Sequence, residues 1–363
     1  MTNGTDQIAA AGQSIWLDTI SRDLLRSGRL KHYIENLHVT GVTSNPSILQ
    51  AAIVGSEDYD EALAMQIANG VRDPEQLVFA LALEDITAAA DLLRPIFDAS
   101  GGVDGYVSIE VSPTLAHDAE GTIAAGRSLF AQADRPNVLI KVPGTAAGVA
   151  AIEQLITEGV PVNATLLFDS AGYEAAAEAY LRGLERRVAA GHPLVVGSVA
   201  SVFVSRWDSA VDAKVSKEMA GMAALAEMQL CYSAFERVCQ SPRFTRLAAS
   251  GALPQRLLFA STSTKNPDLP DTYYVGKLAA SGTIDTIPEK TLLAVADHGY
   301  VCELLQSDGG KARATLDAVA EQGVDLPALA LTLQQQGAEA FSKSWASLLE
   351  DVSTKTHTLA TAV

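Results

Sequence analysis

Short apolar segments alternate with long stretches rich in Ala, Leu and Glu along the chain. The apolar segments have the length and β-branched content of buried strands, and the stretches between them have helical periodicity. The segments that predict strands are residues 14–20, 39–45, 105–111, 137–143, 161–168, 193–204 and 256–262, with a weaker eighth at 272–278. Eight strands that alternate with helices predict an α/β fold, namely a closed (β/α)8 barrel.

Two segments are longer than this alternation requires. Residues 46–100 have the periodicity of at least two helices between the second and third predicted strands, and residues 324–356 predict a C-terminal helix beyond the last strand. Neither a low-complexity tract nor a Pro/Ser-rich linker interrupts the sequence. We therefore predict a single barrel domain over residues 1–363, with these additional helices.

Polar side chains interrupt the predicted strands at a few positions, although strands of a parallel sheet are usually apolar on both faces. In residues 137–143, alternation places Lys141 on the face of Leu139 and Asn137, opposite an apolar face. Further positions of this kind are Asp18, Glu110, Asn163, Thr165 and Ser201. We expect these side chains to face the lumen near the carboxyl ends of the strands, where such barrels carry their chemistry.

The expected group contains one lysine, two carboxylates, the amides of Asn45 and Asn163, and several hydroxyls, including that of Thr43. No histidine lies on a predicted strand and no residues have metal-ligand spacing, so we predict neither a metal nor a cofactor. A lysine removed from water loses its proton more easily, and a neutral amine attacks a carbonyl to form a Schiff base. Nearby carboxylates can move the protons. This combination favours imine-based aldol chemistry over hydrolysis or redox chemistry.

Each of these residues also has a structural interpretation. Lys141 could form a buried ion pair with Glu110 or Asp18. Asp18 could instead cap the helix that follows it. Thr165 and Ser201 could be ordinary hydrogen-bonded hydroxyls. The pattern alone leaves these alternatives open.

Two polar segments are candidates for phosphate binding. "GTAAG" (144–148) lacks the Gly-Lys-Ser/Thr ending of a phosphate loop, which favours a plain turn between a strand and a helix. "STSTKNP" (261–267) follows the seventh predicted strand and includes hydroxyls and Lys265. Barrels often bind phosphate near strands seven and eight, so this segment is either a phosphate site or an ordinary polar turn.

The composition limits the partners of the protein. A net charge of −17 argues against a nucleic-acid backbone or an anionic membrane, but not against small anionic substrates. The three cysteines have no disulfide or metal spacing, and no signal peptide or membrane span is expected, which together predict a cytoplasmic protein. The sequence leaves a monomer and a homodimer as alternatives.

Several segments together resemble one enzyme family. "GVTSNPSI" (41–48) and "VLIKVPGTAAGVAAIEQL" (138–155) strongly resemble the two signature segments of transaldolases. "VNATLLF" (162–168) and the spacing Ser201-x-Phe203-x-x-Arg206 resemble further segments of that family. The resemblance runs from Asp18 to about Lys265, and "STSTKNP" with "DTIPEKTL" (285–292) is typical of a long bacterial branch. The smaller fructose-6-phosphate aldolases of the same superfamily are far shorter than this chain.

The resemblance implies roles for the polar residues of the strands. Lys141 matches the lysine that forms the Schiff base, and Asp18 matches the carboxylate that handles the proton of the donor hydroxyl. Glu110 and Thr165 match the pair that holds a catalytic water. Three further residues match those that bind the hydroxyls of the dihydroxyacetone unit, namely Asn45, Asn163 and Ser201.

The resemblance also implies a phosphate site. Phe203 matches an aromatic residue beside the site, and Arg206 and Ser261 match phosphate contacts. The family often has an arginine two residues beyond that serine, where this chain has Ser263. Lys265 is a substitute, although it offers a point charge rather than a bidentate fork.

The implied reaction moves a dihydroxyacetone group from sedoheptulose 7-phosphate to glyceraldehyde 3-phosphate, in the pentose phosphate pathway. The expected partners are thus phosphorylated sugars. Two alternatives are cleavage of the kind that fructose-6-phosphate aldolases catalyse, with release of dihydroxyacetone, and a non-catalytic barrel.

Overall fold

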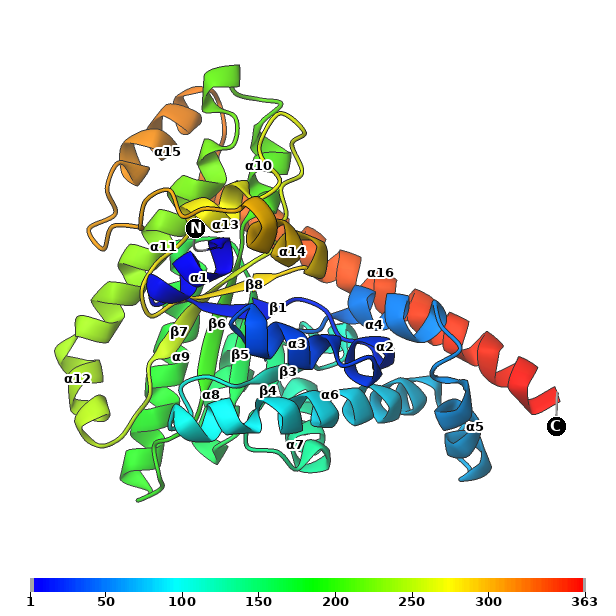
Figure 1. Cartoon of the computed structure of the whole chain (residues 1–363). Helices are drawn as coiled ribbons and strands as arrows, with labels where there is room; N and C mark the ends of the chain where they lie inside the picture. The colour runs from blue at the N-terminus through cyan, green and yellow to red at the C-terminus, as the bar shows by residue number, and fades with distance from the viewer. Residues whose placement is uncertain (1–2, 362–363) are drawn as a thin grey trace.

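Eight parallel strands form a closed barrel in the computed structural model, which describes residues 3–361 (Figure 1). They pair in the order of the sequence, and β8 closes the barrel against β1. The strands are β1 Ser14–Leu17, β2 Val39–Val42, β3 Val107–Glu110, β4 Val138–Pro143, β5 Val162–Leu167, β6 Ser198–Phe203, β7 Gln255–Ala260 and β8 Ile284–Ile287. The predicted (β/α)8 barrel is confirmed.

Helices surround the barrel, and three of them, rather than a single one, lie between β2 and β3. Residues 1–2 and 362–363, which the predicted domain includes, lie outside the described residues. The α-helices are α1 Gly4–Ala10, α2 Arg22–Arg26, α3 Arg29–Asn36, α4 Pro46–Val54, α5 Asp60–Ala68, α6 Pro74–Ala99, α7 Ala119–Ala133, α8 Ala146–Glu158, α9 Ser170–Ala189, α10 Ser205–Val211, α11 Met222–Gln240, α12 Pro242–Ala249, α13 Tyr273–Lys277, α14 Glu289–His298, α15 Ala312–Glu321 and α16 Leu326–Thr361. Two 3₁₀ turns are η1 Pro113–Leu115 and η2 Lys217–Met219.

Strand β4 shows how the register positions the polar side chains. All of its residues are buried, and its partners align Glu110 of β3 and Asn163 of β5 with Lys141. Paired residues of parallel strands point to the same face, so the three side chains lie at one level of the lumen. The chain then turns into α8, where the side chain of Thr145 caps the helix by accepting from the amide of Gly148. The predicted turn between strand and helix is confirmed at Gly144 and Thr145, whereas residues 146–148 are the first turn of α8.

The eighth strand lies downstream of the segment predicted for it. Residues 272–278 form helix α13, in which Tyr274 is buried and donates to Asp208 of α10. The true β8 is only four residues long and includes Asp285 and Thr286, so its sequence lacks an apolar run. Its pairing with β1 and β7 decides its conformation, because tertiary context overrides weak strand propensity.

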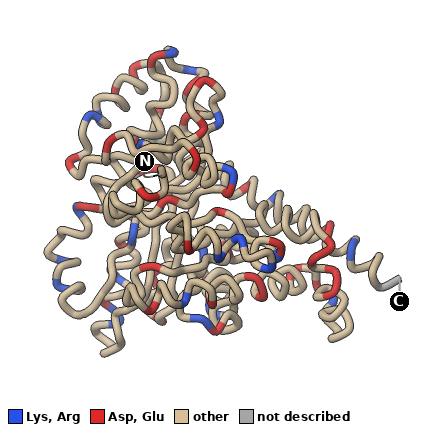
Figure 2. Tube along the Cα trace, in the orientation of Figure 1, with Lys and Arg blue, Asp and Glu red and all other residues tan. Residues whose placement is uncertain are grey.

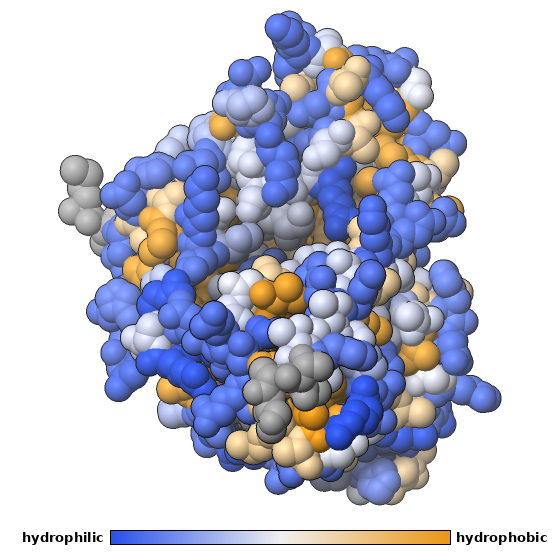
Figure 3. Space-filling model, turned by 90° about the vertical axis from the view of Figure 1, so that its right-hand side faces the viewer, coloured by the Kyte–Doolittle hydropathy of each residue, from blue (hydrophilic) through white to orange (hydrophobic). Residues whose placement is uncertain are grey.

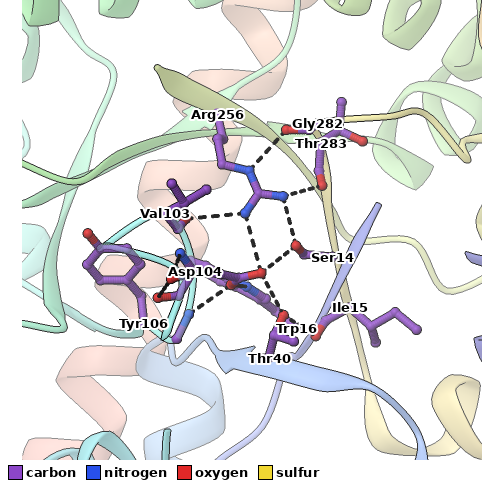
Figure 4. Close-up of polar contacts among 12 residues, drawn as sticks. Ser14, Ile15, Trp16, Thr40, Val103, Asp104, Tyr106, Arg256, Gly282 and Thr283 are labelled. Carbon is purple, nitrogen blue, oxygen red and sulfur yellow. Dashed lines mark hydrogen bonds and ion pairs between the residues drawn. The ribbon is translucent and has the colours of Figure 1, made fainter. Parts of the chain in front are cut away.

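A buried polar network closes the barrel at the amino-terminal ends of the strands (Figure 4). The guanidinium of Arg256 lies 3.4 Å from a carboxylate oxygen of Asp104 and donates to Ser14 at 2.8 Å. Asp104 also accepts from Trp16 at 2.8 Å and from Thr40 at 2.9 Å. The buried charges of Arg256 and Asp104 are tolerated because they are paired and hydrogen-bonded. Their network fills this end of the barrel. The opposite end is left for a functional site.

Charged residues are spread over the helices and loops around the barrel (Figure 2). Hydrophilic side chains cover most of the face in Figure 3, and apolar ones form small separate groups. Within residues 3–361, no helix combines the length and apolar character required to cross a membrane.

Candidate active site

A cavity of about 220 Å³ lies at the carboxyl ends of the strands. Its walls come from strands on opposite sides of the barrel, from the start of α4 and α10, and from α16. Nine of the residues predicted from the sequence line it, namely Asp18, Thr43, Asn45, Lys141, Ser201, Phe203, Arg206, Ser261 and Lys265. The other three predicted residues, Glu110, Asn163 and Thr165, are buried on β3 and β5 and do not line the cavity.

Lys141 is 4% exposed and has few partners for a buried amine. Its Nζ donates to the carbonyl of Ser44 at 3.0 Å and lies 3.5 Å from Oε2 of Glu110. Of the two ion pairs that the sequence offered as alternatives, the structure contains the one between Lys141 and Glu110. The carboxylate of Asp18 lies beyond ion-pair distance of Lys141 Nζ. Because a buried pair stabilises a fold weakly, pairing alone does not account for a lysine that borders a cavity.

The two carboxylates differ in their surroundings. Asp18 follows the end of β1 and accepts a hydrogen bond from Thr43 at 2.6 Å. Removal from water raises the pKa of Asp18, and the charge of Lys141 opposes this shift. Burial raises the pKa of Glu110 to about 7, again against the charge of Lys141. Both groups therefore hold protons more firmly than free carboxyls do, as proton transfer near neutral pH requires.

The alternative that Asp18 caps the next helix is wrong. The side chain of Ser21 caps α2 by accepting from the amide of Leu24. Asp18 is thus free of a capping role, and Thr43, which also bonds to Thr286 at 2.6 Å, orients it.

The polar residues of β5 and β6 form a short chain of hydrogen bonds. Ser201 donates to Oδ1 of Asn163 at 2.7 Å, and Nδ2 of Asn163 donates to Ser108 at 3.1 Å. The interpretation of Ser201 as a satisfied hydroxyl is confirmed. The buried hydroxyl of Thr165, in contrast, has no hydrogen-bond partner among the described residues. A buried polar atom without a partner is rare, and it is a candidate contact for a water or a substrate.

Asn45 has a structural role beside its place in the cavity wall. It is the N-cap of α4, where its Oδ1 accepts from the amide of Ile48 at 3.0 Å. This bond uses the oxygen of the side-chain amide and leaves the Nδ2 group available to donate. Asn45 itself lines the cavity.

Cations lie at one side of the cavity. Arg206 opens α10, its guanidinium is 5.4 Å from the ring of Phe203, and partial burial lowers its pKa. Neither Arg206 nor Lys265 forms an ion pair with a carboxylate in the described part of the chain. Two unpaired cations beside one cavity of an acidic protein favour an anionic ligand there.

The loop after β7 is anchored at each of its first three residues. Ser261 has a left-handed backbone with φ of 59°, and its hydroxyl lies 2.9 Å from that of Ser205. Thr262 donates to Asp285 at 2.9 Å, and Ser263 lies 3.3 Å from the hydroxyl of Thr291. The loop is thus held in one conformation beside Arg206, and Ser263 supplies no charge.

Sequence reasoning missed several residues of the site. Thr286 was missed because the eighth strand was predicted at residues 272–278, upstream of its true position. Alternation along the correct strand would have placed Thr286 in the lumen. Phe341 lies on α16, whose position over the barrel no local pattern predicts. The missed residues of the cavity wall are Ser47, Ala260, Ser263, Thr286, Pro288 and Phe341.

Residues 3–361 contain no group of three or more His, Cys, Asp or Glu side chains that could hold a metal ion. The chemistry on hand is that of an amine, two carboxyl groups, amides, hydroxyls and two cations.

A buried lysine beside carboxyl groups, at the carboxyl end of a (β/α)8 barrel, defines the class of aldolase-type barrels that act through a Schiff base. The profile described as "Transaldolase/Fructose-6-phosphate aldolase" matches residues 15–352, and the chain belongs to this family.

Similar proteins match over nearly their whole length. The chain is 47% identical to a transaldolase of Acidothermus cellulolyticus, over 96% of this chain and 95% of that protein. It is 46% identical to a transaldolase of Frankia alni, over 96% of both chains. It is 45% identical to a transaldolase of Thermobifida fusca, over 97% of this chain and 98% of that one.

Proposed function

We propose that this protein is a transaldolase that transfers a dihydroxyacetone group from sedoheptulose 7-phosphate to glyceraldehyde 3-phosphate, in the pentose phosphate pathway. The observation that carries this proposal is Lys141, a buried amine that borders the cavity and lies 3.5 Å from Glu110. The curated relatives that match the whole chain are named transaldolases, which supports the same reaction.

The first half of the reaction forms and uses the Schiff base. The neutral amine of Lys141 attacks the ketose carbonyl, and the carbinolamine loses water when Glu110 protonates its hydroxyl. Asp18 then takes the proton of the hydroxyl next to the bond that breaks, and the carbon–carbon electron pair moves into the iminium. An aldose leaves, and a three-carbon enamine stays on Lys141. Addition of this enamine to the second aldehyde and hydrolysis of the new imine restore the amine.

The remaining polar residues would bind the transferred group. Asn45 and Ser201 line the cavity together with Lys141, and Asn163 lies behind them with its Oδ1 bonded to Ser201. These amides and this hydroxyl suit the hydroxyls of dihydroxyacetone. Phe203 packs against Phe168 with 5.5 Å between ring centroids and forms an apolar wall beside them. Glu110 and Thr165 would hold a water molecule, a role supported by the unpartnered hydroxyl of Thr165.

The protonation of Glu110 predicts a pH dependence. A carboxyl group with a pKa of about 7 keeps its proton below that pH and loses it above. We therefore expect the rate of Schiff-base formation with fructose 6-phosphate to fall as the pH rises through about 7. Timed borohydride trapping measures this rate. In Glu110→Gln the rate should be about 10²–10⁴-fold lower and should lack this fall; an unchanged pH profile in the variant would contradict the role.

The cations at the cavity predict a difference between two variants. In Arg206→Ala we expect the KM for phosphorylated sugars to rise about 10–100-fold, because a hydrogen bond to a charged group contributes about 1.5–3 kcal/mol. Lys265→Ala should raise it less, since Lys265 supplies a point charge from a flexible side chain. The control is an unphosphorylated donor, whose KM should not change. Equal losses for both donors would argue against a phosphate contact.

One assay separates transfer from simple cleavage. The protein is given fructose 6-phosphate with and without an acceptor aldehyde, and free dihydroxyacetone is measured. A transaldolase needs the acceptor for turnover, whereas efficient release without acceptor would identify an aldolase instead. A non-catalytic barrel would show neither turnover nor a borohydride-trapped adduct.

We also propose a cytoplasmic location, which the three free cysteines support. Phosphorylated sugars are the proposed partners, and nucleic acid and membrane are not, given the net charge of −17. A monomer and a homodimer are both compatible with this function.

A further inference from the structure

Helix α16 is held across the open end of the barrel. Near its start, Nε2 of Gln334 donates to the carbonyls of Gly144 and Leu166, at 3.1 and 3.0 Å, in the segments that follow Lys141 and Thr165. Farther along, α16 lies beside α4 (Figure 1), and Ser344 contacts Ser47 at 2.9 Å. The helix is therefore attached to elements on two sides of the cavity.

More bonds hold the second half of this helix. Trp345 donates to Glu75 of α6 at 3.1 Å and packs on Phe79 at 5.2 Å between ring centroids. Nζ of Lys355 donates to the carbonyl of Ser56 at 2.7 Å and pairs with Asp60. These contacts fix which face of α16 meets the barrel.

That face approaches the site closely. Residues 334, 337 and 341 follow helical spacing, so they lie on one side of α16. At Gly337, a Cβ atom would lie 3.0 Å from Leu166 and 3.2 Å from the guanidinium of Arg206. The absence of a side chain thus lets the helix backbone pack directly over residues of the cavity rim.

Phe341 lies one turn farther along, over the amine. Its ring centroid is 5.8 Å from Nζ of Lys141, it lines the cavity, and it is only 6% exposed. The ring adds an apolar surface to a wall that otherwise holds mainly polar groups near the amine. An aromatic ring at this distance also favours a cation, such as an iminium nitrogen.

We propose that Phe341 determines whether the enzyme transfers or releases its three-carbon group, because its ring excludes water from the Schiff base on Lys141. This inference rests on the proposed function. It concerns a residue that no strand of the barrel supplies and that the first half of the reaction does not require.

The competing step shows what the ring has to prevent. Release begins when the enamine carbon takes a proton from water, which regenerates the iminium. Water then adds to the iminium carbon, the carbon–nitrogen bond breaks, and dihydroxyacetone leaves the amine of Lys141. Both events need water at the intermediate during the wait for the acceptor, and a site closed by an apolar ring suppresses such side reactions.

The test compares Phe341→Ala with Phe341→Leu in the full-length protein. With sedoheptulose 7-phosphate as donor and glyceraldehyde 3-phosphate as acceptor, the measured quantity is the ratio of free dihydroxyacetone released to fructose 6-phosphate formed by transfer. We expect Phe341→Ala to raise this ratio about ten-fold or more, and Phe341→Leu, which keeps apolar bulk, to stay near the unaltered protein. The matched control is Leu331→Ala, on the same helix but 64% exposed.

Borohydride trapping on Lys141 separates the possible failures. If Phe341→Ala still forms the trapped adduct but keeps the original ratio, the inference is overturned while the proposed function stands. If the unaltered protein forms no adduct on Lys141, the proposed function itself fails. If all three variants raise the ratio equally, the effect comes from a weakened helix, and the specific role of the ring is refuted.

Discussion

Lys141→Met is expected to abolish both transfer and the formation of a borohydride-stable adduct. Methionine has a similar length but no amine, so the carbonyl of the sugar meets no nucleophile. We expect transfer activity to fall at least about 10⁴-fold, as for loss of a covalent catalyst. Mass spectrometry of the intact protein after reduction with fructose 6-phosphate measures the adduct directly.

The fold should tolerate this substitution. Glu110 loses its partner, but burial already raises the pKa of that carboxyl, and without the opposing charge of Lys141 it takes up a proton more readily. The matched control is Lys311→Met, which replaces an exposed lysine with the same residue. Retention of the adduct in Lys141→Met, or its loss in Lys311→Met, would falsify the assignment of Lys141.

Asp18→Asn is expected to separate Schiff-base formation from bond cleavage. Asparagine keeps an oxygen that can accept the hydrogen bond from Thr43, but it cannot accept the proton of the substrate hydroxyl. We expect cleavage to slow about 10²–10⁴-fold, the usual contribution of a general base. The trapped adduct with fructose 6-phosphate should still form, because its formation depends on Lys141 and Glu110.

The control for Asp18→Asn is Asp134→Asn. Asp134 is exposed and has a left-handed backbone with φ of 46°, which asparagine adopts readily. This second variant should keep normal activity. If Asp18→Asn lost adduct formation and cleavage to the same extent, Asp18 would act earlier in the reaction than proposed.

Local patterns predicted most of the barrel and the centre of the site. Strand β4 combines an apolar run with one lysine, and the register with β3 and β5 then brings Glu110 and Asn163 to the level of Lys141. Alternation along a strand is a local property, so the lumen-facing side of each recognised strand could be read before the structure. The same rule failed for residues 272–278, where buried aromatic residues belong to a helix.

The sequence by itself determined the alternation of strands and helices, the chemical set around Lys141 and the family. The tertiary structure decided where the barrel closes, since β8 with Asp285 and Thr286 has no strand signal of its own. It also decided which distant segments complete the site. Phe341 lies 200 residues after Lys141 in the sequence yet 5.8 Å from it in space. Such contacts depend on how whole elements pack, and periodicity within one element does not encode them.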